Sequence, residues 1–82
     1  MGDEKLREKM RRSPAGWRLR ELHKLYRSYG FDRREGSKHV IYRHPVYPQL
    51  RATVARHDPV RNVYVRDALD LIDRLEAAGD VW

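Results

Sequence analysis

The spacing of the apolar residues changes twice along the chain, and this change limits the possible folds more than any other feature of the sequence. Apolar residues recur every three or four positions before Gly30 and again after Asn62, whereas between these two points they alternate with polar residues. The first spacing is typical of an amphipathic helix and the second of a half-buried strand. The sequence therefore predicts strands that lie between two helices.

The two helical segments carry residues that suit helix ends. Ser13 can accept a hydrogen bond from an unpaired amide and Pro14 fits a first helical turn, so the first helix is predicted to run from Pro14 to Tyr29. Asn62 is a suitable N-cap for a second helix, predicted from Val63 to Ala78. The residues predicted to face the core are Leu19, Leu22, Leu25, Tyr26 and Tyr29 in the first helix and Val65, Ala68, Leu69, Ile72 and Leu75 in the second.

Three strands are predicted between the helices. Phe31–Glu35 and Lys38–Arg43 would form a hairpin around a turn at Gly36 and Ser37, and Gln49–Arg56 follows a proline-containing connection as the third strand. Side chains alternate between the two faces of a strand. The core face should therefore hold Val40, Tyr42, Leu50, Ala52 and Val54, and the outer face His39, Ile41, Arg43, Arg51, Thr53 and Ala55.

The predicted fold class is α+β. We expect an α-β-β-β-α two-layer sandwich, in which a three-stranded antiparallel sheet carries two helices on one face, as in double-stranded-RNA-binding domains. The 82 residues are enough for one domain, predicted over residues 13–82, and the absence of cysteine leaves it to be held by packing alone. Residues 1–12 offer only Leu6 and Met10 at helical spacing, which predicts a basic, mobile leader with one or two helical turns.

The net charge of +6 indicates an anionic partner, and nucleic acid is the leading candidate. Basic residues outnumber acidic ones by 16 to 7 in residues 1–65, whereas acidic residues prevail by 5 to 2 in residues 66–82. The alternative is that the arginines only keep the surface hydrated. No apolar run reaches the roughly 20 residues of a membrane span, and the first residues lack the apolar part of a signal peptide, so a soluble cytoplasmic protein is expected.

His39 is the strongest candidate for catalysis, because it shares the predicted outer face with Arg43 and Arg51. An imidazole near its usual pKa of about 6.5 can take the 2′-hydroxyl proton of RNA, or protonate the leaving 5′-oxygen, without a metal. Nearby arginines would bind the phosphate and stabilise its developing charge.

The remaining histidines and the acidic residues have ordinary structural interpretations. His23 is expected as a solvated side chain on the first helix, and His44 in a turn. His57 is expected in the loop after the third strand, where it either caps the loop or approaches the outer face. The spaced aspartates of residues 67–73 fit a solvated helix face, so neither a metal nor a cofactor is expected.

Three ordered motifs resemble the HicA toxins of bacterial toxin–antitoxin pairs: Gly30-Phe31, then Gly36-Ser37-Lys38-His39-Val40-Ile41-Tyr42, then Thr53-Val54-Ala55-Arg56-His57. The resemblance covers about Leu19 to Gly79, with Ala55 where members often have proline. It implies mRNA cleavage by His39 as the catalytic residue, a turn shaped by Gly36 and Ser37, and inhibition by a HicB-type antitoxin. The residues expected to bind RNA are Lys38, Arg43, Arg51, Arg56 and His57.

The sequence thus predicts the toxin of a toxin–antitoxin system, a metal-independent endoribonuclease that cleaves mRNA in the bacterial cytoplasm and is inhibited by a HicB-type antitoxin. One alternative is a non-catalytic RNA-binding module that uses the same basic face. The other is a degenerate toxin that acts only through protein contact. Turnover of RNA would separate the enzyme from both alternatives.

Overall fold

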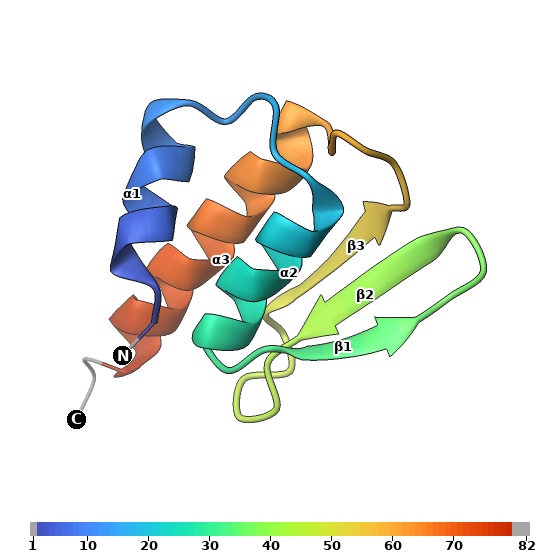
Figure 1. Ribbon diagram of the computed structural model, residues 1–82. Helices are drawn as coiled ribbons and strands as arrows, with labels where there is room; N and C mark the ends of the chain where they lie inside the picture. Colours follow the sequence, from blue (N-terminus) through green and yellow to red (C-terminus); the bar gives the residue numbers. More distant parts are fainter. Residues whose placement is uncertain (1, 80–82) are drawn as a thin grey trace.

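The computed structural model describes residues 2–79 of the chain. The three strands form one antiparallel sheet in the order β1-β2-β3, and the helices lie on one side of it (Figure 1). The predicted α+β class and antiparallel sheet are confirmed, but there are two helices before the sheet where one was predicted. Residues 80–82, which the predicted domain includes, lie outside the described part. The elements are α1 (Glu4–Arg12), α2 (Leu19–Ser28), β1 (Asp32–Glu35), β2 (His39–Arg43), β3 (Arg51–Ala55) and α3 (Asn62–Gly79).

The N-terminal segment differs from the predicted leader, because it is a nine-residue helix, α1, packed against α3. Met10 is completely buried in the core. Arg7 binds the carboxylates of Asp73 and Glu76, and Arg11 Nη2 lies 2.9 Å from Asp73 Oδ1. The basic and acidic ends of the sequence therefore meet in space. The prediction failed here because α3 supplies the apolar surface and the anionic partners that the local sequence of α1 lacks.

The second helix begins later than the sequence predicted. Ser13 does not start it, because the Ser13 amide donates to the Lys9 carbonyl and ends α1. The first residue of α2 is Leu19, whose amide donates to Asp58 Oδ1 at 2.6 Å, across 39 residues of sequence. A carboxylate beside the unpaired amides of a first turn stabilises a helix start. This carboxylate comes from a distant loop, so the residues around the helix start gave no sign of it. The start predicted from Ser13 and Pro14 was therefore too early.

The core lies between the helices and the inner face of the sheet. The predicted alternation is confirmed, because the inward side chains of β2 and β3 are buried or partly buried and the outward ones are exposed or partly exposed. Tyr26 of α2 stacks on Tyr42 of β2, with ring centroids 4.2 Å apart. This contact ties α2 to the sheet. The fully buried side chains include Met10, Leu22, Leu25, Tyr26, Phe31, Val40, Tyr42, Val54, Val65 and Ile72.

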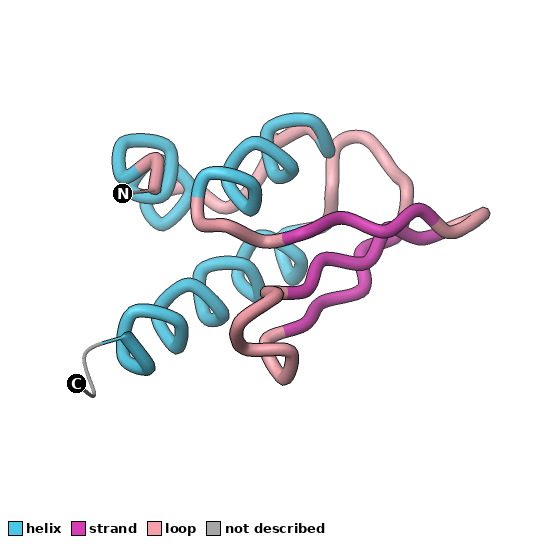
Figure 2. The backbone as a smooth tube through the Cα atoms, turned by 90° about the horizontal axis from the view of Figure 1, so that it is seen from below, coloured by secondary structure: helices cyan, strands magenta, loops and turns pink. Residues whose placement is uncertain are grey.

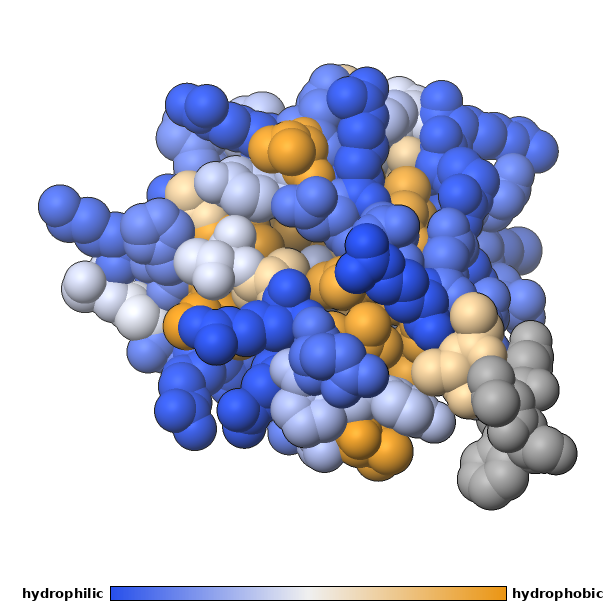
Figure 3. All heavy atoms as spheres, turned by 180° about the vertical axis from the view of Figure 1, so that it is seen from behind, coloured by the Kyte–Doolittle hydropathy of each residue, from blue (hydrophilic) through white to orange (hydrophobic). Residues whose placement is uncertain are grey.

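The face of the molecule opposite to the one seen in Figure 1 is mostly polar. Figure 3 shows hydrophilic side chains over most of the face seen from behind, with smaller apolar areas between them. Val46, in the loop after β2, and Val63, at the start of α3, are the most exposed large apolar side chains described, at 69% and 51%. None of the helices in residues 2–79 has the length and apolar composition needed to cross a membrane.

Candidate active site on the open sheet face

The outer face of the sheet is open, and the strand register arranges its side chains in rows. Figure 2, which views the molecule from below, shows the three strands side by side. Directly opposite residues of neighbouring antiparallel strands place their side chains on the same face. The register therefore gives three outer rows: His39 and Ala55; Arg34, Ile41 and Thr53; and Asp32, Arg43 and Arg51.

His39 begins β2 immediately after a tight turn. The Gly36 amide donates to the His39 carbonyl oxygen at 2.8 Å, and a Cβ at Gly36 would lie only 2.9 Å from that oxygen. Glycine is therefore required at this position by the close approach of the backbone. Ser37 and Lys38 form the exposed tip of the turn, and the Arg56 amide donates to the Lys38 carbonyl at 3.1 Å. These bonds fix the point at which His39 leaves the turn and enters the sheet.

A concave site of about 420 Å³ lies near His39. Its lining combines outward residues of the three strands with Arg27 of α2 and Arg33, which belong to the helix-facing side, so the site reaches past the edge strand β1. Ile41 lines it, and His39 is two residues away on the same strand face, or roughly 7 Å. The site contains the predicted Arg43 and Arg51. It also contains Arg27 of α2 and Arg34 of β1, which the sequence analysis missed. We call this concavity the arginine groove; its lining residues are Arg27, Asp32, Arg33, Arg34, Ile41, Arg43 and Arg51.

Pairing of β1 with β2 would have been enough to find Arg34 from the sequence. In a hairpin closed by the Gly36-Ser37 turn, the outward position opposite Ile41 falls on Arg34. The same register places Asp32 opposite Arg43, so one carboxylate lies in the row of Arg43 and Arg51. Arg27 carries no such local signal, because its position depends on how α2 packs on the sheet.

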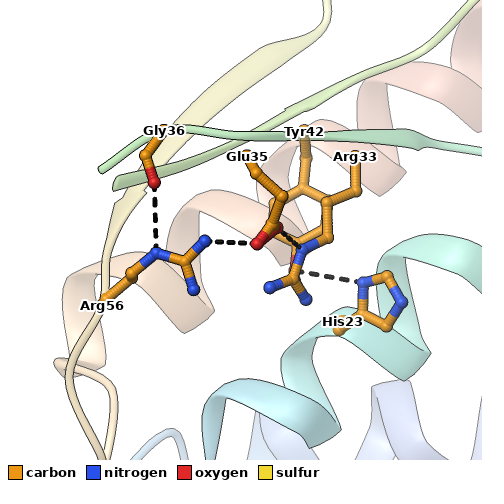
Figure 4. A network of polar contacts seen from close by, with 6 residues as sticks. All are labelled: His23, Arg33, Glu35, Gly36, Tyr42 and Arg56. Carbon is orange, nitrogen blue, oxygen red and sulfur yellow. Dashed lines mark hydrogen bonds and ion pairs between the residues drawn. The ribbon is translucent and has the colours of Figure 1, made fainter. Parts of the chain in front are cut away.

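Arg56 lies on the helix-facing side of the sheet, away from His39. It follows Ala55, which faces outward, and its guanidinium pairs with the Glu35 carboxylate and donates from Nε to the Gly36 carbonyl at 3.3 Å (Figure 4). Arg33 pairs with the same carboxylate. The structure therefore does not bring Arg56 together with the other predicted RNA-binding residues. Instead, Arg56 and Glu35 brace the turn that precedes His39.

His23 is not the solvated imidazole that was predicted. It is half-buried, and its Nδ1 lies 3.2 Å from the Tyr42 hydroxyl, which also accepts a hydrogen bond from Arg33 Nη1 at 3.4 Å (Figure 4). Burial lowers the pKa of His23, and the positive charges of Arg33 and Arg27 lower it further. Because arginine can only donate, the Tyr42 hydroxyl is free to donate its proton to a neutral His23. His23 thus joins this bracing network rather than the open face.

The other two histidines have structural partners in loops. His44 Nδ1 accepts hydrogen bonds from the amides of Val46 and Tyr47 at 3.1 and 3.4 Å, which confirms its predicted role in a turn. His57 Nδ1 lies 2.9 Å from the Pro59 carbonyl, so the ring nitrogen donates there and the side chain closes the loop after β3. Among the described residues, His39 is then the histidine available on the open face.

The aspartates of α3 are partly used in ion pairs. Asp70 pairs with Arg74 within α3, and Asp73 pairs with Arg7 and Arg11 of α1. Partial burial opposes the ionisation of Asp73, but hydrogen bonds from the two arginines outweigh it and lower its pKa. Within residues 2–79, no cluster of three histidine, aspartate or glutamate side chains is arranged to hold a metal ion.

Comparisons of the chain with protein-family models, with curated proteins and with solved structures find no match. The assignment of a function therefore depends on the geometry of the open face and on the sequence motifs that lie on it. Gly36 and His39 of one motif form the turn that enters β2, and Arg56 of the next motif donates hydrogen bonds to the Gly36 and Lys38 carbonyls. The His57 side chain lies against the Pro59 carbonyl in the loop after β3.

Replacing Glu35 by glutamine should remove a pH-dependent part of the stability. Hydrogen bonds from Arg33 and then Arg56 lower the pKa of Glu35 to about 2 from its usual 4.5. A carboxylate with a lowered pKa in the folded state stabilises the protein above pH 4.5, and this contribution is lost as the pH falls towards 2. In thermal melts, the wild type should melt above Glu35→Gln at pH 7, and the two curves should converge near pH 2.

Asp32→Asn is the matched control, since Asp32 is an exposed carboxylate on the same strand. Asp32 forms no ion pair within residues 2–79, so the melting temperature of Asp32→Asn at pH 7 should be close to that of the wild type. If the difference in melting temperature between wild type and Glu35→Gln were the same at pH 7 and pH 2, the ion pairs of Glu35 with Arg33 and Arg56 would not contribute to stability.

Proposed function

We propose that this chain is a toxin of the HicA kind, a metal-independent endoribonuclease that cleaves mRNA in the cytoplasm with His39. The observation that supports this most is the position of His39 on the open sheet face, next to the arginine groove. An exposed imidazole beside a cationic concavity can contact a bound phosphodiester and exchange a proton with its 2′-hydroxyl or its 5′-oxygen. The HicA-like motifs Gly36 to Tyr42 and Thr53 to His57 support the same assignment.

The proposed reaction is an internal transesterification. The 2′-oxygen of a ribose attacks the adjacent phosphorus, the bond from phosphorus to the 5′-oxygen breaks, and a cyclic 2′,3′-phosphate and a 5′-hydroxyl end result. His39 either takes the 2′-hydroxyl proton or supplies a proton to the departing 5′-oxygen, and solvent water accepts or supplies the other proton. Arg43 and Arg51 would bind the phosphate oxygens and stabilise the charge that develops on them.

Chelation provides the direct test of this proposal. Purified protein should cleave a single-stranded RNA at an unchanged rate in excess EDTA, and it should bind but not cut DNA of the same sequence, because DNA lacks the 2′-hydroxyl nucleophile. Product ends analysed by mass spectrometry should carry the cyclic phosphate. Cleavage that stops in EDTA, or digestion of the DNA, would contradict the mechanism.

A non-catalytic RNA-binding module is the second candidate, and one observation favours it. The histidine hydrogen bonds found within residues 2–79 belong to His23, His44 and His57, so no described protein group orients the imidazole of His39. A general base usually has such a partner. In this case RNA would bind the same face with the same salt dependence and would be recovered intact.

The partner proposed for this chain is a HicB-type antitoxin that covers the open face. An acidic partner would be attracted by the basic groove, and occlusion of His39 would prevent cleavage without a change of conformation. Amide exchange of the complex should show protection of Lys38–Arg43 and Gln49–Ala55 rather than of Asp67–Glu76. The reverse pattern would mean that the antitoxin docks on α3.

A further inference from the structure

The arginine groove carries more positive charge than the two predicted arginines supply. Arg27 and Arg34 line it together with Arg43 and Arg51. Within residues 2–79, none of these four guanidinium groups lies within ion-pair distance of a carboxylate; the ion pairs there involve other arginines and Lys24. Arg33 also contributes to the lining, but its guanidinium is turned towards Glu35 and Tyr42.

These free charges lie in one direction from His39. The row of His39 contains Ala55, the next row contains Arg34, and the row after that contains Arg43 and Arg51. Successive rows on one face are two residues apart, or roughly 7 Å. In the opposite direction from His39 lies the Gly36–Lys38 turn, which carries Lys38. The Arg56 guanidinium, which also contacts this turn, is paired with Glu35. The positive charge is therefore distributed unequally about the candidate catalytic residue.

The groove itself suits a phosphate-bearing strand. Its charged lining comes from α2 and from all three strands, with Asp32 as the one acidic member. Concavities lined by charges of one sign concentrate the electric field and attract ions of the opposite sign. Guanidinium groups bind phosphate oxygens through paired N–H donors. This geometry favours a directly bound phosphodiester over small anions that only neutralise the charge from a distance.

We propose that the arginine groove binds the RNA strand on one side only of the bond that is cleaved at His39. Phosphates on that side lie along the rows of Arg34 and then Arg43 and Arg51, and continue towards Arg27. The nucleotides on the other side pass the turn at Lys38 with little electrostatic contact. This inference rests on the proposed function for the place of cleavage, but the binding track itself does not depend on catalysis.

Binding to an uncleavable strand tests the track separately from the reaction. The probe is a fluorescent single-stranded oligonucleotide with 2′-deoxy residues, titrated at several salt concentrations. The logarithm of the association constant falls with the logarithm of the salt concentration, and each lost phosphate contact reduces the magnitude of this negative slope by about 0.7 for a single strand. The double variant Arg27→Ala with Arg34→Ala should therefore reduce the magnitude of the slope by about 1.4. Lysine at both positions should largely restore it.

The matched control removes the same charge elsewhere. Arg20 of α2 and Arg66 of α3 are exposed and do not line the groove. Arg20→Ala with Arg66→Ala should leave the slope unchanged. Equal salt slopes for the two double variants would show that the groove is not a phosphate site. A poly-glutamate peptide is the second probe. If the groove variant lost binding to this peptide but kept its affinity for the oligonucleotide, the groove would be a site for acidic protein segments instead. The four exposed side chains can be changed with little loss of stability, which melting curves verify.

Two chimeric strands test whether binding is one-sided. Each contains one ribonucleotide in a DNA strand, placed near the 5′ end in one strand and near the 3′ end in the other. The groove variant should raise KM for one strand and leave the other unchanged, whereas an equal rise for both would overturn the one-sided track. Failure of the proposed function is a different result: neither strand is cut by the wild type, while the difference in salt slope remains.

Discussion

Replacement of His39 by alanine is expected to abolish RNA cleavage while the protein keeps its fold. The side chain is exposed at the first residue of β2, and exposed substitutions usually change stability by less than about 0.5 kcal/mol. Loss of a general acid or base lowers a reaction rate by roughly 10² to 10⁴-fold. Single-turnover cleavage of a labelled RNA, together with a melting curve of the same preparation, measures both properties.

Arg20→Ala is the control for this experiment, since it removes an exposed charged side chain of α2 that does not line the arginine groove. It should cleave RNA at the wild-type rate. An equally active His39→Ala variant would refute the catalytic assignment. If His39→Ala bound the oligonucleotide as well as the wild type did, and neither protein cut RNA, the non-catalytic RNA-binding module would become the better explanation.

Replacement of Met10 by alanine is expected to lower the free energy of unfolding by about 2 to 5 kcal/mol. Met10 is fully buried in the core beneath α1, and truncation of a buried side chain removes its contacts and leaves a cavity. For a domain of this size each kcal/mol lowers the melting temperature by roughly 4 to 8 °C. Urea unfolding followed by circular dichroism measures the change directly.

Lys9→Ala changes the neighbouring exposed position of the same helix and should leave the stability nearly unchanged. Both variants place alanine in the same helix, so the difference between their free energies of unfolding reports the loss of the buried side chain and not a change in helix propensity. A Met10→Ala variant as stable as Lys9→Ala would mean that residues 1–12 do not pack on α3 in solution, as the sequence had predicted for a mobile leader.

The open face could be predicted because its pattern is local. Strict alternation placed Val40 and Tyr42 inside and His39 and Arg43 outside, and the structure has the same arrangement. The turn at Gly36 was predicted for the same reason, since residues close in sequence form it. Arg34 could have been added from the hairpin register alone.

The parts that sequence analysis missed depend on residues far apart in the chain. The structure places the Arg56 guanidinium against Glu35, which lies on another strand, and the local sequence gives no sign of this ion pair. Arg27 reaches the groove only because α2 packs across the sheet, a contact made by the stacked rings of Tyr26 and Tyr42.

In β2 and β3 the sequence by itself determined which residues face the core and which face outward, because side-chain direction in a strand follows from backbone geometry with a short period. It also determined the hairpin of the first two strands and the exposure of His39. Only the tertiary structure decided that residues 4–12 form a packed helix and that α2 begins at Leu19. Arg7 meets Asp73 across 66 residues and Leu19 meets Asp58 across 39, and such contacts stabilise an element only after the chain has brought their partners together.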